Sequence, residues 1–311
     1  MTENTRRDGL VGIGELSRRT GVPVRTLRFY CDEGILEPRR SSGGHRLFDP
    51  VTTVDQVLLV RRLRGLGLSL TAIAGVLTDA MSISEAVSAE RAALDTELGA
   101  LRWRRASLVA VEDAAPTRRA ARLTLLSSVH DRHAAFDSLV ALWRRLLAPL
   151  PSDMFDGFVA MNIPEPPAEP TARQVVAYAE LVTVTADPAS TRAMSRQLWR
   201  PGPADVHDKR VLLTGVAEAC GAAGPLVVAR VQPRSGAELD QFLAAHAAAR
   251  RRRDTPRFRQ RILHGGNDTD PRIHRYWKLT TEITGETTAG AAHYWLYRAL
   301  ERATKPGASM P

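Results

Sequence analysis

The sequence predicts an all-α, mainly helical protein that is built from three parts. The first eighty residues hold short helical patterns separated by turn residues, residues 82–113 form one long helical pattern, and further helical patterns continue to the end of the chain. We therefore expect a small domain at 1–81, a coiled-coil helix at 82–113 and a helical domain at 114–311.

The composition is that of a globular protein with a basic excess. The chain has 311 residues, 44% of them hydrophobic, so extensive disorder is excluded. There are 43 Lys and Arg residues against 34 Asp and Glu, which leaves a net charge of +9. This excess favours anionic partners, nucleic acid first, although an arginine bias also arises from a GC-rich genome.

The cysteine count and the absence of long apolar runs exclude several other classes. Cys31 and Cys220 are too few for a disulfide scaffold or a four-cysteine zinc site. The first ten residues lack the apolar core of a signal peptide, and no apolar run approaches the roughly 18 residues of a membrane span. We expect a soluble cytoplasmic protein with no membrane partner, no cofactor and no metal.

A helix-turn-helix pattern opens the chain. Gly21 ends a short helix, Pro23 lies in the first turn of the next one, and Gly34 closes it. Gly43-Gly44 then predicts a hairpin turn with basic residues on both sides. This is the layout of a winged helix-turn-helix domain, which we place at 1–81.

Capping signals predict the helices that follow. Asp49-Pro50 and Ser69 each precede a helical pattern. Ser82 and Glu85 have the spacing of a capping box and start the long pattern at 82–113. Apolar residues recur there with heptad spacing, which is typical of a coiled coil: Val87, Leu94, Leu98, Leu101 and Leu108. The alternative is an amphipathic helix packed within its own chain.

The motifs of residues 11–113 resemble the MerR family of transcription regulators. The run Arg-Thr-Leu-Arg-Phe-Tyr (25–30), the Gly-Ile-Leu exit (34–36) and the Gly-Gly-His-Arg-Leu-Phe wing (43–48) stand in the family's order, followed by the dimer helix. The resemblance covers about a third of the chain.

The second helix has residue types suited to the major groove. Arg25 is expected to read a guanine edge and Thr26 to contact a base or a phosphate, whereas Arg28 and the wing arginines suit phosphate oxygens. The resemblance implies that Arg46 binds phosphate and that Tyr30 clamps the sugar-phosphate backbone. The full set assigned to DNA contact is Arg18, Arg25, Thr26, Arg28, Tyr30, Arg39, Arg40, His45, Arg46 and Arg61. For any single arginine the alternative is a solvated surface charge.

Two positions depart from the family pattern. His45 stands where a tyrosine is common, and a protonated imidazole still donates to phosphate. Cys31 stands where an acidic residue is usual, and we interpret it as a small, semi-buried side chain rather than a redox switch.

The resemblance implies a homodimer that binds promoter DNA. The two long helices pair in antiparallel fashion and place two winged domains on a pseudo-palindromic site. The bound dimer bends and untwists the promoter spacer for RNA polymerase holoenzyme, as an activator, a repressor or both. Distorting a site of about 20 bp costs on the order of 1–6 kcal/mol, which protein contacts must offset.

The C-terminal part has no motif that identifies a ligand, but its size and aromatic content favour an organic effector. Metal binding is disfavoured, because His130 and His133 are three apart on a helix but no thiolate or third histidine lies nearby. The aromatic residues predicted to line an effector site are Trp143, Tyr178, Trp199, Tyr276, Trp277, Tyr294 and Trp295. Ordinary core packing is the better interpretation for any single one of them.

Three function classes remain open from the sequence. The first is an effector-responsive transcription regulator that is not an enzyme. The second is an enzyme or protein-interaction domain tethered to a DNA-binding module, although no catalytic motif is present. The third is an architectural DNA-binding protein. The arginine run at 250–261 has a net charge of +6 and suits flanking DNA, polymerase or an anionic ligand, or is only a solvated helix end.

Overall fold

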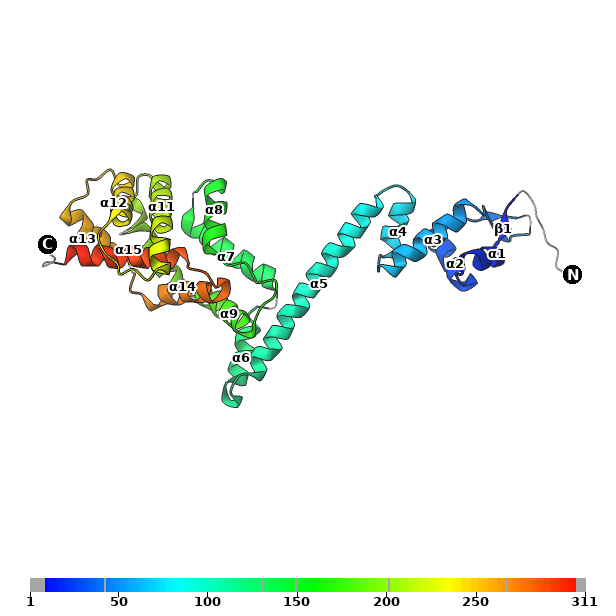
Figure 1. Cartoon of the computed structure of the whole chain (residues 1–311), viewed down its shortest axis with the longest axis horizontal. Coiled ribbons are helices and arrows are strands. Elements are labelled where there is room, and N and C mark those ends of the chain that lie inside the picture. The colour runs from blue at the N-terminus through cyan, green and yellow to red at the C-terminus, as the bar shows by residue number, and fades with distance from the viewer. Residues whose placement is uncertain are drawn as a thin grey trace. The chain divides into compact units, whose positions relative to one another are not determined.

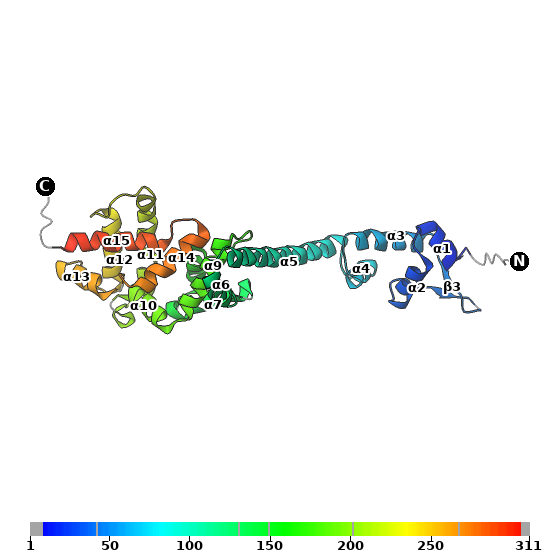
Figure 2. The same ribbon diagram turned by 90° about the horizontal axis from the view of Figure 1, so that it is seen from below.

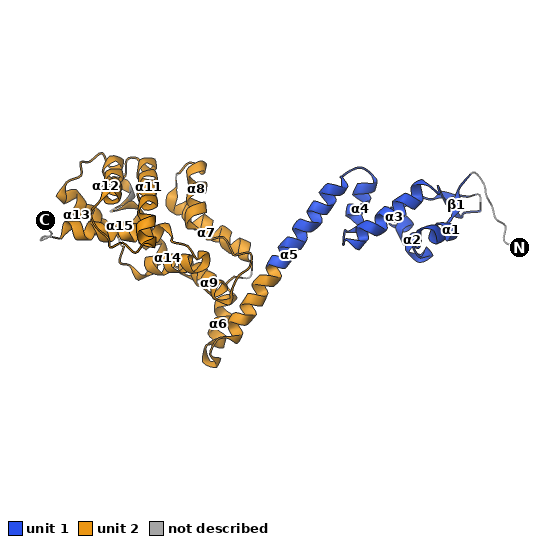
Figure 3. Cartoon of the chain, in the orientation of Figure 1, with its two compact units in different colours: residues 1–99 blue, residues 100–311 orange. Residues whose placement is uncertain are grey.

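The computed structural model describes residues 9–305 apart from positions 42, 130, 149, 201 and 267. That part of the chain contains fifteen α-helices and one three-stranded sheet, which confirms the all-α prediction (Figure 1). The chain divides into two compact units, residues 1–99 and residues 100–311 (Figure 3).

The first unit combines four short helices with a small antiparallel sheet. The strands have the order β1-β3-β2, with Val11 opposite Phe48 and Arg40 opposite Arg46. The elements are β1 Val11–Gly12, α1 Ile13–Thr20, α2 Val24–Asp32, β2 Arg39–Arg40, β3 Arg46–Phe48, α3 Thr52–Gly65 and α4 Leu70–Leu77, followed by the first part of α5 Ile83–Glu112.

The turn between α1 and α2 depends on a left-handed glycine. Gly21 has a φ of +68°, and its N–H donates to the carbonyl oxygen of Ser17 at 2.9 Å. This bond satisfies a carbonyl at the end of α1 and turns the chain toward α2. Pro23 precedes α2 rather than lying in its first turn, so that boundary differs from the prediction by one residue.

The core of the first unit joins the helices to the wing. Leu16, Leu27, Phe48, Val57 and Ile73 come from five different elements, and each is at most 1% exposed. Because Phe48 belongs to β3, the hairpin is anchored to the same core as α1 and α2. Burial of such side chains stabilises by about 1.5–3 kcal/mol each.

The predicted capping residues occupy the starts of α4 and α5. Ser69 accepts a hydrogen bond from the N–H of Ala72 at 3.2 Å. Ser82 and Glu85 form the expected reciprocal pair, with the N–H of Glu85 donating to Ser82 Oγ at 3.1 Å and the N–H of Ser82 donating to Glu85 Oε2 at 2.7 Å. These bonds start α5, a helix of 30 residues that continues from the first unit into the second.

The second unit is helical throughout its described residues. It begins within α5, whose Trp103, Ala106 and Ala110 are buried in this unit. The other elements are η1 Pro116–Arg118, α6 Arg119–Leu126, α7 Arg132–Leu147, α8 Ser152–Asn162, α9 Ala172–Ala186, α10 Pro188–Trp199, η2 Pro203–Asp205, α11 Lys209–Val228, α12 Ala237–Ala249, α13 Pro256–Gly265, α14 Pro271–Thr284 and α15 Ala289–Thr304.

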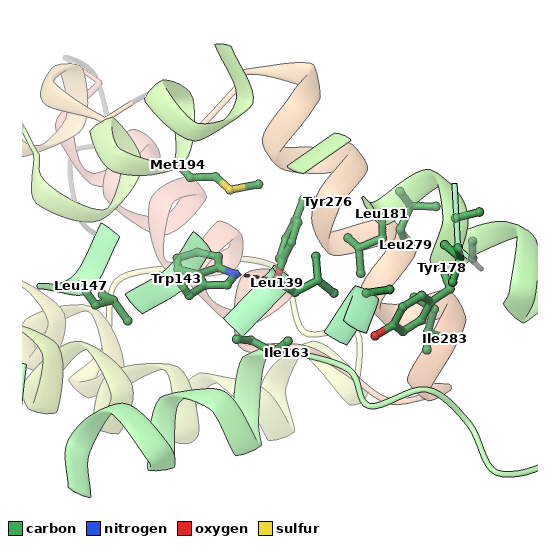
Figure 4. Close-up of a cluster of buried hydrophobic side chains, with 14 of the residues drawn as sticks. Leu139, Trp143, Leu147, Ile163, Tyr178, Leu181, Met194, Tyr276, Leu279 and Ile283 are labelled. Atoms are coloured by element: carbon green, nitrogen blue, oxygen red, sulfur yellow. Dashed lines mark hydrogen bonds between the residues drawn. The ribbon is translucent and has the colours of Figure 1, made fainter. Parts of the chain in front are cut away.

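Aromatic side chains hold the larger core of this unit together. Trp143 Nε1 donates to the hydroxyl oxygen of Tyr276 at 2.8 Å (Figure 4). That hydroxyl donates to the carbonyl oxygen of Asn162 at 3.3 Å. Tyr178 meets Trp103 edge to face, with 5.6 Å between ring centroids. These contacts join α5, α7, α9 and α14, and they satisfy polar atoms that burial would otherwise leave unpaired.

The sequence is compatible with either a strand or a buried helix at residues 224–233. In the structure, this segment begins inside a helix. α11 continues to Val228 with Pro225 in its last turn. It runs beside α12 in both ribbon views, and a Cβ on Gly215 would lie 2.5 Å from the Ala245 Cβ, so the two helices approach closely (Figure 2). By length and composition alone, α11 is long and apolar enough to cross a membrane. Core helices of soluble proteins meet the same two criteria.

Gly21→Ala should destabilise the helix-turn-helix by about 1–2 kcal/mol, because an L side chain is strained in the left-handed region. Gly14→Ala is the matched control, since Gly14 lies within α1 at ordinary φ and a Cβ there meets no atom within 4 Å. Hydrogen-exchange mass spectrometry of peptides spanning 13–36 measures both. A Gly21→Ala variant with unchanged protection would contradict the role given to this residue.

Candidate nucleic-acid interface and ligand cavity

The second helix of the first unit has one buried and one exposed face. Leu27 is fully buried and Tyr30 is 8% exposed, and both belong to the core. Arg25 and Arg28 lie on the opposite, exposed face. Because residues three apart share a helix face, burial of Leu27 and Tyr30 directs Arg25 and Arg28 outward.

Within the described part of the chain, four of the predicted arginines on α2 and the hairpin form no hydrogen bond or ion pair, although the charge of Arg39 helps to lower the pKa of Asp49. Arg25, Arg28, Arg39 and Arg40 are exposed. Among the described residues, none of these four makes a side-chain hydrogen bond or an ion pair. Their guanidinium groups are therefore free for an external anion.

The other predicted arginines of this unit are held by neighbouring groups. Arg18 pairs with Glu15 at 2.6 Å, and Arg46 pairs with Asp32 at 2.6 Å. Arg61 Nη1 donates to the carbonyl oxygen of Thr20 at 3.3 Å, just before the turn. A phosphate would have to compete with these intramolecular partners, and surface ion pairs of this kind contribute only about 0–1 kcal/mol.

A basic hollow lies between α2 and the hairpin. It has a volume of about 430 Å³. Four basic residues line it, Arg28, Arg40, His45 and Arg46, and glycines such as Gly12 expose backbone to it. The hairpin turn is held by the N–H of His45, which donates to Ser41 Oγ at 3.1 Å. The structure thus brings Arg28 of α2 together with Arg40, His45 and Arg46 of the wing, whereas Arg25, Thr26, Tyr30 and Arg39 do not line this hollow.

Tyr30 and Phe29 differ from what the sequence suggests. Tyr30 contributes mainly to the core, so a contact with DNA is confined to the small exposed part of its side chain. Phe29 is 47% exposed and lies on the helix beside Arg28, yet sequence reasoning did not select it. A large aromatic on the exposed face of a basic helix is the signal that was available for this residue.

An apolar stripe remains uncovered along α5. The five residues predicted for dimerisation, taken in order from Val87 to Leu108, are 37%, 46%, 46%, 52% and 63% exposed. The opposite face of the same helix is buried in the second unit through Trp103, Ala106 and Ala110. Large apolar side chains in a heptad row on the surface are typical of a protein interface.

The second unit contains a large cavity of about 810 Å³. Residues from α7, α8, α10, α11, α12, α14 and α15 line it, and its walls are mainly apolar. Its size lies in the range of about 300–1,000 Å³ that is usual for organic ligands.

Only part of the predicted aromatic set lies at this cavity. Trp143 and Trp277 line it, and Tyr294 lines a smaller hollow of about 200 Å³. The remaining four are core residues that are at most 5% exposed: Tyr178, Trp199, Tyr276 and Trp295. Trp295 Nε1 donates to the carbonyl oxygen of Val231 at 2.8 Å, which accounts for its position.

A buried polar network closes one end of the cavity. Arg200 forms an ion pair with Asp268, and both side chains are at most 1% exposed. Gln197 Nε2 donates to Asp268 Oδ1 at 3.4 Å, and His293 Nδ1 lies 3.5 Å from the same oxygen. Burial and the neighbouring Arg200 lower the pKa of His293 to about 4, although Asp268 raises it, so this imidazole is neutral at neutral pH.

A second buried arginine adjoins this network. Arg250 Nη1 donates to His246 Nδ1 at 2.9 Å, and Arg250 Nη2 donates to the carbonyl oxygen of Trp199 at 2.5 Å and to that of Arg200. Burial lowers the pKa of Arg250 to about 10 and, together with Arg200 and Arg250, holds that of His246 well below its usual value.

The arginine run at 250–261 is therefore not one solvated patch. Arg250 is buried, Arg259 pairs with Asp254 at 2.7 Å, and Arg261 pairs with Asp205 at 2.9 Å. The positions that remain exposed include Arg251, Arg252, Arg253 and Arg257. An anionic partner would meet this last group without displacing an intramolecular ion pair.

The cysteines and histidines show no further reactive centre in the described residues. No group of three or more His, Cys, Asp or Glu side chains there is placed to hold a metal, and His130 lies outside the described residues. Burial raises the pKa of Cys220 to about 12 and also raises that of Cys31. Both thiols are therefore protonated at neutral pH, which disfavours a redox role.

Comparison with known proteins identifies the first unit. Residues 12–80 match the model of the MerR HTH family regulatory protein, which confirms the predicted resemblance for this segment. The HTH-type transcriptional regulator HmrR of Rhizobium leguminosarum bv. viciae is 41% identical over 59 residues, which is 19% of this chain and 45% of that protein. The nodulation protein NolA of Bradyrhizobium elkanii is 45% identical over 71 residues, 22% of this chain and 32% of that protein.

A third relative gives the same result. The mercuric resistance operon regulatory protein of Bacillus cereus is 37% identical over 62 residues, which is 20% of this chain and 46% of that protein. The chain spans less than half the length of each of these curated relatives. No solved structure matches the chain. Residues 12–80 thus form a MerR-type helix-turn-helix domain.

The buried His293 predicts that stability depends on pH. Between the ordinary pKa of 6.5 and the folded-state pKa of about 4, the unfolded chain binds a proton that the folded chain does not. The free energy of unfolding should therefore fall as the pH is lowered through this range, by about 1.4 kcal/mol per pH unit for one histidine. Denaturant unfolding followed by tryptophan fluorescence measures this free energy for the second unit, because all five tryptophans lie beyond residue 100.

In the His293→Gln variant, the slope of the unfolding free energy against pH should be smaller by about 1.4 kcal/mol per pH unit. His264→Gln removes an exposed imidazole on α13 and is the matched control, which should keep the parent slope. Equal slopes for the parent and His293→Gln would contradict the assignment of a neutral, buried His293.

Proposed function

We propose that this protein is a MerR-type dimeric transcriptional regulator that binds double-stranded promoter DNA. The observation that carries the proposal is the set of four unpartnered, exposed arginines on α2 and the wing of a MerR-type domain, Arg25, Arg28, Arg39 and Arg40. Arginine in this setting both reads guanine edges and pairs with phosphate oxygens. The relatives named as regulators support the same function.

The proposed roles within the interface follow from position. Arg25 and Thr26, near the start of α2, meet base edges, because recognition helices contact bases with their N-terminal residues. Arg28, Tyr30 and the wing residues of the basic hollow hold the phosphate backbone. Arg18 and Arg61 add backbone contacts after leaving their intramolecular partners.

A homodimer provides two such surfaces. The exposed apolar stripe of α5 supports pairing of two long helices, with the winged domain at 1–81, the pairing helix at 82–113 and a regulatory domain at 114–311. Two half-sites then lie one helical turn or a multiple of it apart on a pseudo-palindrome. By analogy with the family, the dimer distorts the promoter spacer and thereby controls RNA polymerase holoenzyme.

The regulatory signal is an organic small molecule that binds to residues 114–311. The cavity of about 810 Å³ supports this part of the proposal, since it is large enough for a drug-sized ligand. The protein acts in the cytoplasm, without a membrane partner, a cofactor or an enzymatic activity of its own.

Arg25→Ala should weaken binding to selected sites by about 1–3 kcal/mol and relax base preference, whereas Arg46→Ala should weaken binding to all sequences alike. Sites are obtained by selection from random-sequence DNA with the full chain, and affinities are measured by fluorescence anisotropy. Arg145→Ala, an exposed arginine on α7, is the matched control. An equal loss across all sequences for both variants would contradict the division into base and phosphate contacts.

The combined variant Leu94→Glu with Leu101→Glu should raise the dimer dissociation constant by more than about 100-fold, because like charges would face each other across the apolar seam. Sedimentation equilibrium of the full chain measures this constant. Val211→Glu changes an apolar residue of similar exposure, 40%, on α11 and should leave the dimer intact. A dimer that survives the double change would exclude the α5 stripe as the pairing surface.

A further inference from the structure

The cavity of the second unit has a lining that limits the kind of molecule it can hold. Aromatic rings from α7, α8 and α14, those of Trp143, Phe158 and Trp277, form part of its wall. The rings of Trp143 and Phe158 are tilted against each other, with 4.8 Å between ring centroids and an interplanar angle of 51°. An occupant of this space gains by burying apolar surface, at about 25 cal/mol per Å².

Basic residues are absent from the described lining of the cavity, although the chain holds 43 lysines and arginines. An organic anion placed there would lose its hydration without meeting a cation, which costs several kcal/mol. The two carboxylates of the lining, Glu218 and Glu286, lie on exposed residues, and Glu218 already accepts a hydrogen bond from Gln241 at 3.2 Å.

The deeper end of the cavity does not favour a cation. Gln197, His246 and His293 provide the polar surface of this end, and all three are uncharged at neutral pH. Behind them, the charge of Arg200 is balanced by Asp268. Arg250 donates to carbonyl oxygens and an imidazole nitrogen, and the carboxylate that acts on its charge, that of Asp205, is already paired with Arg261. A buried positive charge therefore stands behind this wall and repels a second one.

One buried donor in this wall lacks an acceptor. Because His246 Nδ1 accepts from Arg250, the proton of its neutral ring is on Nε2. That Nε2–H is buried and has no hydrogen-bond partner among the described residues. An unmade hydrogen bond of this kind costs about 1–3 kcal/mol, which an acceptor on an occupant of the cavity would recover.

We propose that this cavity binds a large, uncharged, mainly apolar organic molecule that presents a hydrogen-bond acceptor to the end lined by Gln197, His246 and His293. The inference rests on the proposed function in so far as that function assigns an effector to residues 114–311, and it adds the site and the chemical class. The apolar walls supply most of the affinity, and the polar end orients the molecule.

The chain offers matched variants for testing the site. Gly221 lies on α11 in the cavity lining, and a Cβ there would meet no atom within 4 Å, so Gly221→Trp fills the cavity without disturbing its wall. Ala217→Trp, one turn earlier and also in the lining, is a second filling variant. Ala222→Trp is the control, because Ala222 is exposed on the same helix and lies outside the lining.

The experiment titrates the full chain with two dyes, Nile red, which is uncharged and carries a carbonyl acceptor, and anilinonaphthalene sulfonate, which is an anion. Nile red should bind at one site per chain and at least about tenfold more tightly than the sulfonate. Gly221→Trp and Ala217→Trp should each weaken Nile red binding at least about tenfold, and Ala222→Trp should not. Tighter binding of the sulfonate, no binding of Nile red, or binding that neither filling variant weakens would overturn the proposal.

His246→Phe tests the acceptor. The substitution keeps an aromatic ring and leaves Arg250 its bonds to the carbonyl oxygens of residues 246, 199 and 200. It should weaken Nile red about five- to tenfold and leave the binding of pyrene, which has no acceptor, unchanged. Equal losses for the two dyes would refute the acceptor assignment.

A separate measurement distinguishes this inference from the proposed function. Anisotropy of labelled DNA is followed with and without saturating Nile red. Cavity binding without any change in DNA affinity supports the site and its ligand class but contradicts the effector role. DNA binding by a chain that binds no Nile red contradicts the inference and leaves the DNA-binding part of the proposed function intact.

Discussion

Burial of one face of α2 determines the direction of the basic surface of the first unit. Leu27 is fully buried among residues of α1, α3 and β3, and Tyr30 lies beside it in the same core. The helix has only 9 residues, so fixing this face fixes the opposite one, which carries Arg25 and Arg28. Phe48 extends the same core into the hairpin and thereby sets the position of the wing arginines relative to α2. The interface therefore depends on hydrophobic packing that contains no arginine.

The second unit depends on a different constraint, a buried pair of arginines near the end of α10. Arg200 reaches Asp268 and the carbonyl oxygen of Ile262 at 3.3 Å, while Arg250 reaches the last carbonyl oxygens of α10 and its own helix. These bonds connect α10, α12, α13 and the start of α14 around the polar end of the cavity. Removing one partner of such a network is costly, about 3–5 kcal/mol, because it leaves a buried charge unpaired. Burial, together with the charges of the nearby arginines, lowers the pKa of the two cavity histidines and keeps them neutral.

Local signals in the sequence were sufficient for the helix ends of the first unit. Gly21, Ser69 and the Ser82–Glu85 pair act through bonds to residues no more than four positions away, so the sequence alone predicts them. The outward direction of Arg25 and Arg28 also follows from helical periodicity. Contacts between residues far apart in the sequence could not be predicted in this way. The pairing of Arg46 with Asp32, the burial of Tyr30 and the burial of Arg250 depend on tertiary packing. Seven helices contribute residues to the cavity, and of the seven aromatics predicted for a ligand site only Trp143 and Trp277 reach it.

The most direct test of the central claim is arginine footprinting of the full chain with phenylglyoxal, read by mass spectrometry, with and without double-stranded DNA at low salt. The four unpartnered guanidinium groups of α2 and the wing, those of Arg25, Arg28, Arg39 and Arg40, should react readily in the free protein and become protected when DNA is bound. The exposed Arg145 on α7 should react at the same rate in both states. If DNA binds while these four arginines keep their full reactivity, the face of α2 described above is not the surface that meets DNA.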